Sequence, residues 1–267
     1  MKGDNMTEVN DPSLWWKQAV VYQVYPRSFK DSRGEGLGQI AGVTEKIGYL
    51  KELGVDAIWL SPFYPSQLAD GGYDVDDYRN VDPKLGSMDD FDALAKAAHA
   101  DGIKIVVDIV PNHSSNLHEW FKAALAAKPG SPERDRYIFR DGKGPNGDEP
   151  PTNWQNHFGG PAWTRVPDGQ WYLHMFTKEQ PDWNWKNEDV RADFIKTLRF
   201  WLDHGADGFR VDVAHGLAKD LDRDDLDDYV VWCTNDQPED GSHPVIDRDE
   251  VHDIYHCLLY TSDAADD

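Results

Sequence analysis

Arg210 and Asp212 lie two positions apart in the apolar run GFRVDV, late in the 267-residue chain. If this run is a β-strand, the two side chains point to the same face of it and lie side by side. The guanidinium would then favour the ionised form of the Asp212 carboxyl, which is the form that can act as a nucleophile. An Arg-x-Asp pair on a strand is also commonly a structural ion pair, so the pattern alone leaves both roles open.

Polar residues also follow two earlier apolar runs. The loop ADGGYDVDDY, with Asp70 and Tyr73, follows the run that ends at Leu60, and the run IKIVVDIV, interrupted by Asp108, leads into PNH, which ends at His113. Taken singly, these residues are typical of turns and of loop hydrogen bonds. Their order on successive strand ends favours one shared site, because parallel α/β folds place reactive groups at the carboxyl ends of their strands.

The elements that would position these residues repeat one pattern. Apolar residues at helical spacing are followed by a glycine and then by a short apolar, β-branched run. The pattern occurs three times, with glycines at Gly54, Gly102 and Gly205 and apolar runs at residues 55–60, 103–110 and 208–213. A further run at residues 19–25 predicts a fourth strand.

The predicted fold class is α/β. Runs that are apolar at nearly every position are buried on both faces, which is typical of a parallel sheet covered by helices. Ser87 and Asn187 are suited to cap the second and third helices. Between residue 113 and about residue 187 the composition shifts to Gly, Pro, Asn and Trp, which predicts a loop-rich subdomain inserted after the third strand.

Composition excludes some classes of partner. Lys and Arg number 27 against 49 Asp and Glu, a net charge of −22, whereas a nucleic-acid-binding protein needs a basic face. No run approaches eighteen apolar residues, so we expect no membrane association. Cys233 and Cys257 cannot form a disulfide scaffold and lack zinc-ligand spacing. A reducing, cytoplasmic location is the expectation.

Five segments together resemble a known family. WWKQAVVYQVYPRSF, ADGGYDVDDY, DIVPNH, QPDWNW and GFRVDVAHG are similar, in this order, to the signature regions of the α-amylase superfamily (glycoside hydrolase family 13). The form QPDWNW resembles its α-glucosidase and oligo-1,6-glucosidase branch. The resemblance implies a (β/α)₈ barrel that hydrolyses terminal α-glucosidic bonds of disaccharides or short malto- or isomalto-oligosaccharides with retention, and that requires no cofactor.

The resemblance also implies roles for individual residues. Asp212 would be the nucleophile that forms the glycosyl-enzyme, and Arg210 would hold it. Asp70 would bind hydroxyls of the terminal glucose, Tyr73 would stack on its ring, and His113 would hydrogen-bond to it. Retention needs a second carboxyl group about 5 Å away as acid and base. Family members supply it as a glutamate on the fifth strand, and no segment here resembles that region.

The family pattern suggests how the chain is organised. The barrel domain would comprise residues 1–112 and 187–256, and the inserted subdomain residues 113–186. Residues 257–267 match neither helical nor strand periodicity and would be a probable non-native tail. We therefore expect the N-terminal half of a barrel, with an open sheet edge. Such a chain should be inactive by itself and poorly soluble.

The loop DSRGEGLGQ resembles the calcium loop of the same branch. Calcium is held by oxygen ligands, for which Asp31 and Glu35 are candidates. Arg33 and Gln39 stand at positions that are richer in oxygen in the branch, and Arg33 brings a positive charge into the ligand set. A structural calcium ion is therefore a possibility that the resemblance raises and these two residues weaken.

Two alternatives to hydrolysis share these motifs. A catalytically dead relative could serve as a binding or interaction module, although it would have no need of all five site residues. A transglycosylase or isomerase on the same scaffold would differ in its products. Val213, directly after Asp212, resembles the residue that accompanies α-1,6 cleavage, whereas the segment DVAHG resembles enzymes acting on maltose-like substrates, so the linkage stays open.

Overall fold

The computed structural model describes residues 12–231 and 240–263. The main sheet has four parallel strands in the order β1-β2-β3-β7, which are β1 (Val21–Val24), β2 (Ala57–Leu60), β3 (Lys104–Ile109) and β7 (Gly208–Val211). All four strands predicted from the sequence are present, and the α/β fold class is confirmed. Because the strands are parallel, their C-terminal ends all lie at the same end of the sheet.

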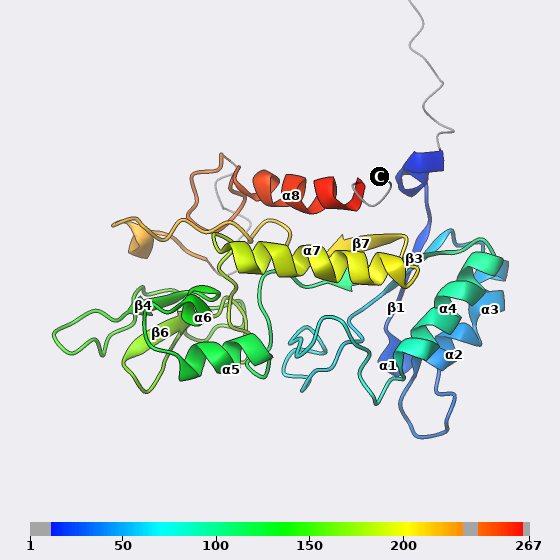
Figure 1. Cartoon of the computed structure of the whole chain (residues 1–267), viewed down its shortest axis with the longest axis horizontal. Helices are drawn as coiled ribbons and strands as arrows, with labels where there is room; N and C mark the ends of the chain where they lie inside the picture. The colour runs from blue at the N-terminus through cyan, green and yellow to red at the C-terminus, as the bar shows by residue number, and fades with distance from the viewer. Residues whose placement is uncertain (1–11, 232–239, 264–267) are drawn as a thin grey trace, which may run out of the picture.

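Helices precede, connect and follow these strands along the chain (Figure 1). Before β3 they are the 3-10 helix η2 (Pro12–Lys17), α1 (Pro26–Phe29), α2 (Ile40–Thr44), α3 (Ile47–Leu53) and α4 (Met88–Ala100). After β3 they are α5 (Glu119–Ala126), α6 (Pro132–Asp135), α7 (Glu188–Asp203), the 3-10 helix η3 (Leu226–Asp228) and α8 (Val251–Asp263). The helical pattern at residues 40–53 is thus divided into two short helices.

Local signals fix where the longer helices begin and end. The Ser87 side chain accepts a hydrogen bond from the backbone of Asp90, and the Asp90 side chain accepts one from the backbone of Ser87, which forms a capping box at α4. Asn187 caps α7 in the same manner through its side-chain oxygen. Gly54 ends α3 at a φ of 82°, a left-handed conformation that favours glycine.

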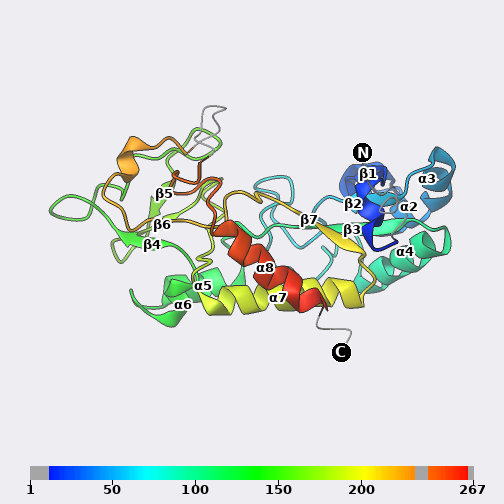
Figure 2. The ribbon, with the colours of Figure 1, turned by 90° about the horizontal axis from the view of Figure 1, so that it is seen from above.

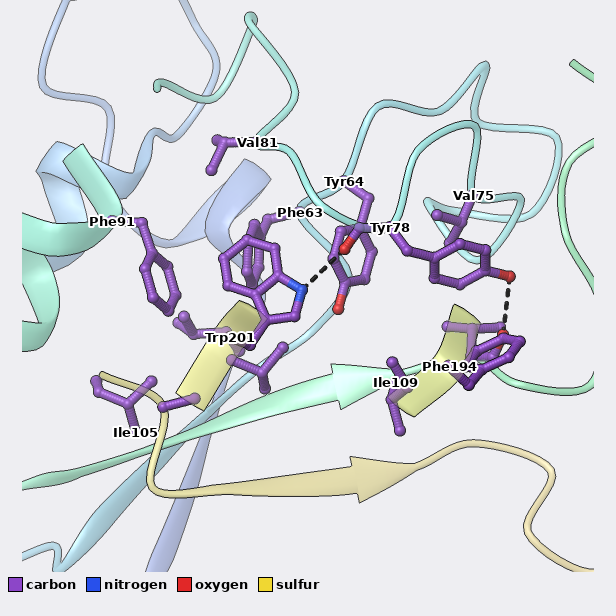
Figure 3. Close-up of a cluster of buried hydrophobic side chains, with 14 of the residues drawn as sticks. Phe63, Tyr64, Val75, Tyr78, Val81, Phe91, Ile105, Ile109, Phe194 and Trp201 are labelled. Carbon is purple, nitrogen blue, oxygen red and sulfur yellow. Dashed lines mark hydrogen bonds between the residues drawn. The ribbon is translucent and has the colours of Figure 1, made fainter. Parts of the chain in front are cut away.

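An aromatic core lies between the main sheet and its helices. Figure 3 shows Trp201 of α7 inserted beside Phe63 and Phe91, and its ring lies 4.8 Å from that of Phe91 in an edge-to-face arrangement. The indole Nε1 donates to the backbone carbonyl of Tyr78 at 2.8 Å. Trp201 is fully buried, and this hydrogen bond satisfies its only polar side-chain atom. Its ring joins α7 to the loop after β2.

The strands differ in burial. Residues of β2 and β3 are mostly buried, whereas every residue of β7 is partly exposed. At the other edge, Val21 on β1 and the preceding Val20 are 47% and 58% exposed. The expectation of strands buried on both faces is therefore confirmed for the two central strands and wrong for the edges, because each edge strand has a neighbour on one side only.

The chain segment that connects β3 to α7 forms a second, antiparallel sheet. Its order is β4-β6-β5, from β4 (Phe139–Asp141), β6 (Gln170–Leu173) and β5 (Trp163–Arg165). Figures 1 and 2 show it at the opposite end of an elongated molecule from β1. Trp163 of β5 is buried in one cluster with Trp154, and Leu221 and Val245, from the segment after β7, pack into the same cluster. The acidic segment after β7 therefore covers this second sheet.

The last helix extends beyond the predicted domain boundary at residue 256. The sequence from residue 257 on shows no clear periodicity, yet α8 continues from Val251 through Asp263. The helix runs along α7 in both ribbon views, and Val251 and Ile254 are buried there (Figures 1 and 2). Leu258 packs partly against the same core, so contact with α7 accompanies a helix that the sequence pattern alone does not predict. In the described part of the chain, no helix is long and apolar enough to cross a membrane.

Candidate active site

Arg210 contacts the side-chain carboxyl groups of two aspartates at the C-terminal ends of the main-sheet strands. Its Nη1 atom lies 3.2 Å from Oδ1 of Asp108 on β3 and also donates to Oδ1 of Asp212, which follows β7. The guanidinium lies over the ring of Trp59 on β2, 4.9 Å from its centre. Strands β2, β3 and β7 are adjacent in the sheet, which brings these four side chains together.

Burial controls the charge of both carboxyl groups. The pKa of Asp108 is raised to about 7 by burial, and the charge of Arg210 opposes this rise only in part. The pKa of Asp212 is also raised, again by burial, with Arg210 opposing. Arg210 thus favours the ionised form of Asp212, as expected from the sequence, but the loss of solvent around the carboxylate outweighs the guanidinium.

Asp70 and Tyr73 come from the loop after β2. The Tyr73 hydroxyl donates to Oδ2 of Asp108 at 3.3 Å, next to the bond from Trp59 Nε1 to the same oxygen at 2.9 Å. Asp70 is half-buried, and burial raises its pKa. The charge of Asp70 also raises the pKa of Asp212, which shows that the two carboxyl groups interact electrostatically.

His113 is connected to Asp70 through Gln180 and is 1% exposed. Burial lowers the pKa of its imidazole to about 3, so the ring is neutral near pH 7. Gln180 connects the two residues, since its Nε2 lies 3.1 Å from Asp70 Oδ2 and 2.9 Å from His113 Nε2. The ring of Phe176 lies 4.9 Å from that of His113. All five residues predicted for the main site therefore belong to one connected group.

Sequence reasoning missed other members of this group. Asp108 was named from the sequence as a charged interruption of an apolar run, but its contacts with Arg210, Tyr73 and Trp59 are made only in the folded chain. Gln180 lay in the motif QPDWNW, but only the folded chain brings it to Asp70 and His113 across more than sixty positions. Trp59 was hidden within an apolar run, where its type is expected for packing alone.

The predicted calcium residues have a different arrangement. The Asp31 carboxylate accepts backbone N–H groups of Arg33, Gly34 and Gly36 at 2.7 to 3.0 Å, and these bonds lower its pKa to about 2. Glu35 is exposed. Among the described residues, no group of three or more acidic, histidine or cysteine side chains is placed to hold a metal ion. The Asp31 carboxylate therefore accepts hydrogen bonds from the backbone of its own loop, and the calcium site stays a prediction.

Comparison of the sequence with known proteins identifies relatives that are glycoside hydrolases. The chain is 49% identical over 214 residues to the oligo-1,6-glucosidase of Heyndrickxia coagulans, covering 80% of this chain and 38% of that protein. It is 48% identical over 207 residues to the trehalose-6-phosphate hydrolase of Escherichia coli, covering 77% and 37%. The chain thus spans about two-fifths of the length of these relatives.

Solved structures match the fold. A crystal structure of trehalose-6-phosphate hydrolase from Bacillus licheniformis aligns with a TM-score of 0.81 and 43% identity, covering 92% of this chain and 42% of that one. A trehalulose synthase mutant in complex with Tris aligns with a TM-score of 0.80 and 42% identity, covering 92% and 43%. The sequence also matches the family described as the α-amylase catalytic domain over residues 23–261. The chain therefore belongs to the α-amylase catalytic-domain family.

Proposed function

We propose that the site contributes to retaining hydrolysis of terminal α-glucosidic bonds in disaccharides or short oligosaccharides. The observation that carries the proposal is the position of Arg210 between Asp108 and Asp212, at the strand ends where Asp70 and His113 also lie. Asp212 attacks the anomeric carbon, and Arg210 steadies its carboxylate as the negative charge moves to the new bond. Relatives at 47% to 50% identity are named oligo-1,6-glucosidases, which supports this class of substrate.

The polar groups around Asp212 are suited to hold one glucose unit. Asp70 offers carboxylate oxygens to sugar hydroxyls, and the half-buried Tyr73 offers the face of its ring. His113 is neutral, so its ring carries one N–H donor and one acceptor nitrogen, and Gln180 already contacts its Nε2. We assign the acid and base that retention requires to no residue of this chain, and we expect the chain alone not to turn over aryl α-glucosides.

A substrate with a self-sufficient leaving group tests the nucleophile directly. α-Glucosyl fluoride needs no proton donor: an Asp212 oxygen bonds to the anomeric carbon, the C–F bond breaks, and fluoride leaves with the electron pair. We expect fluoride release and a glucosyl adduct located at Asp212 by mass spectrometry of peptides. Asp212→Asn should form no adduct, and Asp253→Asn, an exposed change on α8, should form it as the wild type does.

An adduct at another carboxyl group, or none on folded protein, would contradict the assignment. Glucosyl transfer to a second sugar is the alternative outcome of the same intermediate, and a trehalulose synthase mutant aligns at 42% identity. Chromatography of the products with and without added glucose separates transfer from hydrolysis. A chain that binds glucose without forming an adduct would favour the binding-module alternative.

We propose that this activity requires no cofactor and that the Asp31 loop is held by its own hydrogen bonds rather than by calcium. The support is the set of N–H donors on the Asp31 carboxylate, together with the positive charge of Arg33 in the same loop. Equilibrium dialysis against labelled calcium should show no tight binding. Stoichiometric, tight binding that is lost in Asp31→Asn would reverse the proposal.

A further inference from the structure

Trp59 belongs to the site, and the proposed chemistry assigns no part to it. It lies on β2 and is partly exposed. In the register of the sheet it is the partner of Val106 on β3, and Asp108, two positions further along β3, is the partner of Arg210 on β7. Side chains that are in register or two positions apart on parallel strands point to the same face. Trp59, Asp108 and Arg210 therefore share one face of the main sheet.

Trp59 contacts both members of one ion pair. Its Nε1 donates to Oδ2 of Asp108 at 2.9 Å, and the guanidinium carbon of Arg210 lies over its ring, 4.9 Å from the centre. Nη1 of Arg210 in turn donates to both carboxyl oxygens of Asp108, at 3.2 and 3.3 Å. An indole N–H can only donate, and a cation is attracted to the negative face of the ring. One side chain thus holds the anion by its edge and the cation by its face.

The two aspartates alone leave the orientation of Arg210 incompletely fixed. In the described part of the chain, every hydrogen bond from Arg210 to Asp108 and Asp212 comes from the same nitrogen, Nη1. A bidentate pair uses two nitrogens and fixes the plane of the guanidinium, whereas bonds through one nitrogen allow that plane to turn. The Arg210 side chain is also 36% exposed, so water competes for its other N–H groups. The flat ring of Trp59 is placed to restrict this turning.

We propose that Trp59 is a positioning residue that keeps the guanidinium of Arg210 directed at Asp212. Its ring restricts the plane of the guanidinium, and its N–H fixes Asp108, the second carboxyl group that Arg210 contacts. The inference deepens the proposed function, on which its meaning for catalysis rests, because Arg210 favours the ionised Asp212 that attacks the anomeric carbon. The orientation of Arg210 itself is a property of the chain without substrate.

Chemical modification of arginine measures how firmly Arg210 is held, because phenylglyoxal reacts fastest with guanidinium groups that have no partner. Mass spectrometry of peptides follows the rate at Arg210 relative to the exposed Arg33 in the same sample. The reaction is run above pH 7, where Asp108, whose pKa is about 7, is ionised. Trp59→Leu removes both the ring and the N–H. We expect Arg210 to react about two- to fivefold faster in this variant than in wild type.

Trp59→Phe separates orientation from simple covering of Arg210. It keeps an aromatic face over the guanidinium and removes the N–H that fixes Asp108. We expect a rate at Arg210 between those of wild type and Trp59→Leu, and this variant carries the test by itself if Trp59→Leu does not fold. A wild-type rate in folded Trp59→Phe would overturn the proposal, because the ring would then act only as a cover.

Trp16→Leu is the matched control for these variants. Trp16 is 59% exposed and lies in η2, before the main sheet, so its loss should leave the rate at Arg210 unchanged. A rate raised as much in Trp16→Leu as in Trp59→Leu would assign the effect to general loosening of the fold and would count against the proposal.

The pH dependence of fluoride release from α-glucosyl fluoride shows whether the orientation of Arg210 affects Asp212. Burial raises the pKa of Asp212, and the charge of Arg210 opposes that rise. Turning Arg210 away weakens this opposition, so the acid limb of the rate should move to higher pH in Trp59→Leu. Loss of packing alone would lower the rate at every pH and leave the limb in place. An unmoved limb in the folded variant would overturn the role of Trp59 toward Asp212.

These results are separable from the proposed function, because arginine modification needs no substrate. Faster reaction of Arg210 in the Trp59 variants, in a chain that forms no glucosyl adduct, would remove the proposed function and leave Trp59 as the residue that orients Arg210. An adduct at Asp212, in a chain whose Arg210 reacts at the same rate with and without Trp59, would remove this inference alone.

Discussion

At the scale of single residues, the site combines groups whose burial and charge oppose each other. Arg210 contacts Asp108 and Asp212, yet the pKa values of both carboxyl groups are raised by burial. The charge state of the group therefore depends on how completely water is excluded. This makes pH the natural variable for testing it.

We predict that Asp108 makes the folded chain lose stability as the pH rises from about 4 to about 7. The pKa is about 7 in the fold against 3.8 for an ordinary aspartate, so the contribution of the protonated form is full below pH 3.8 and lost by pH 7. Asp108→Asn does not titrate, so its free energy of unfolding should rise relative to wild type across this window. Urea denaturation at a series of pH values measures the difference.

The exposed Asp253→Asn is the control for this experiment, and its curve should run parallel to that of wild type. Parallel curves for Asp108→Asn as well would show that the carboxyl group titrates normally. The comparison between variants matters because His113 acts in the opposite sense: its lowered pKa reduces stability as the pH falls from 6.5 to about 3.

We also predict that Val213 is strained. It follows Asp212 with a φ of 49°, a left-handed conformation that β-branched residues rarely adopt. Asn tolerates this conformation, so Val213→Asn should raise the free energy of unfolding by about 1 kcal/mol. Val230→Asn, at an exposed valine outside the left-handed region, is the control. A loss of stability in Val213→Asn larger than in the control would show that packing at Val213 outweighs the strain.

At the scale of elements, capping residues determine where the helices that pack against the sheet begin. The capping box at Ser87 orders the start of α4, which packs against α2. A cap satisfies backbone N–H groups that otherwise have no partner within the helix. Removing one is therefore a defined loss that can be measured.

Ser87→Ala should lower the free energy of unfolding by about 1 kcal/mol, because it removes the hydroxyl that accepts from the Asp90 backbone. Ser28→Ala is the matched control, since Ser28 is exposed and lies in α1. Thermal or urea unfolding of both variants is sufficient. Equal effects at the two positions would mean that the cap contributes nothing beyond the loss of a hydroxyl.

Which elements could be predicted follows from the range of the interactions that make them. Apolar runs, glycines after helices and caps before them act within a few residues. The strands β1, β2, β3 and β7 were therefore predictable from their apolar runs, and the starts of α4 and α7 from their caps. The extension of α8 and the packing of Leu221 beside the second sheet depend on contacts made only in the folded chain. For the same reason the role of Gln180 was missed, although Asp212 and His113 were found from their strand ends.

At the scale of the whole molecule, the main sheet has two unpaired edges in the described chain, at β1 and β7. Exposed strand edges are templates for pairing with another chain, and charged side chains are the usual defence. Val20 and Val21 leave the β1 edge apolar. The net charge of −22 repels copies at a distance without protecting this edge locally.

We predict that Val21→Lys slows self-association. The added ammonium would have to be buried if a second chain paired with β1, whereas it remains hydrated in the single molecule. Light scattering against time, at equal concentration, should show a lower rate than for wild type. Val230→Lys, which places the same charge at an exposed valine away from the main sheet, should have a smaller effect. Equal effects would assign the change to net charge rather than to the edge.

The pairing of β3 with β7 has a consequence for the order of events during synthesis. Val106 is the partner of Gly208, and the Asp108–Arg210 contact beside them spans 102 positions. A ribosome adds about 5–20 residues per second, so β3 waits roughly 5 to 20 seconds for its neighbour. During that interval the segment that forms the second sheet emerges, and the Asp108 carboxyl has no Arg210 beside it. The Asp108–Arg210 contact therefore forms only after the segment of the second sheet has been synthesised.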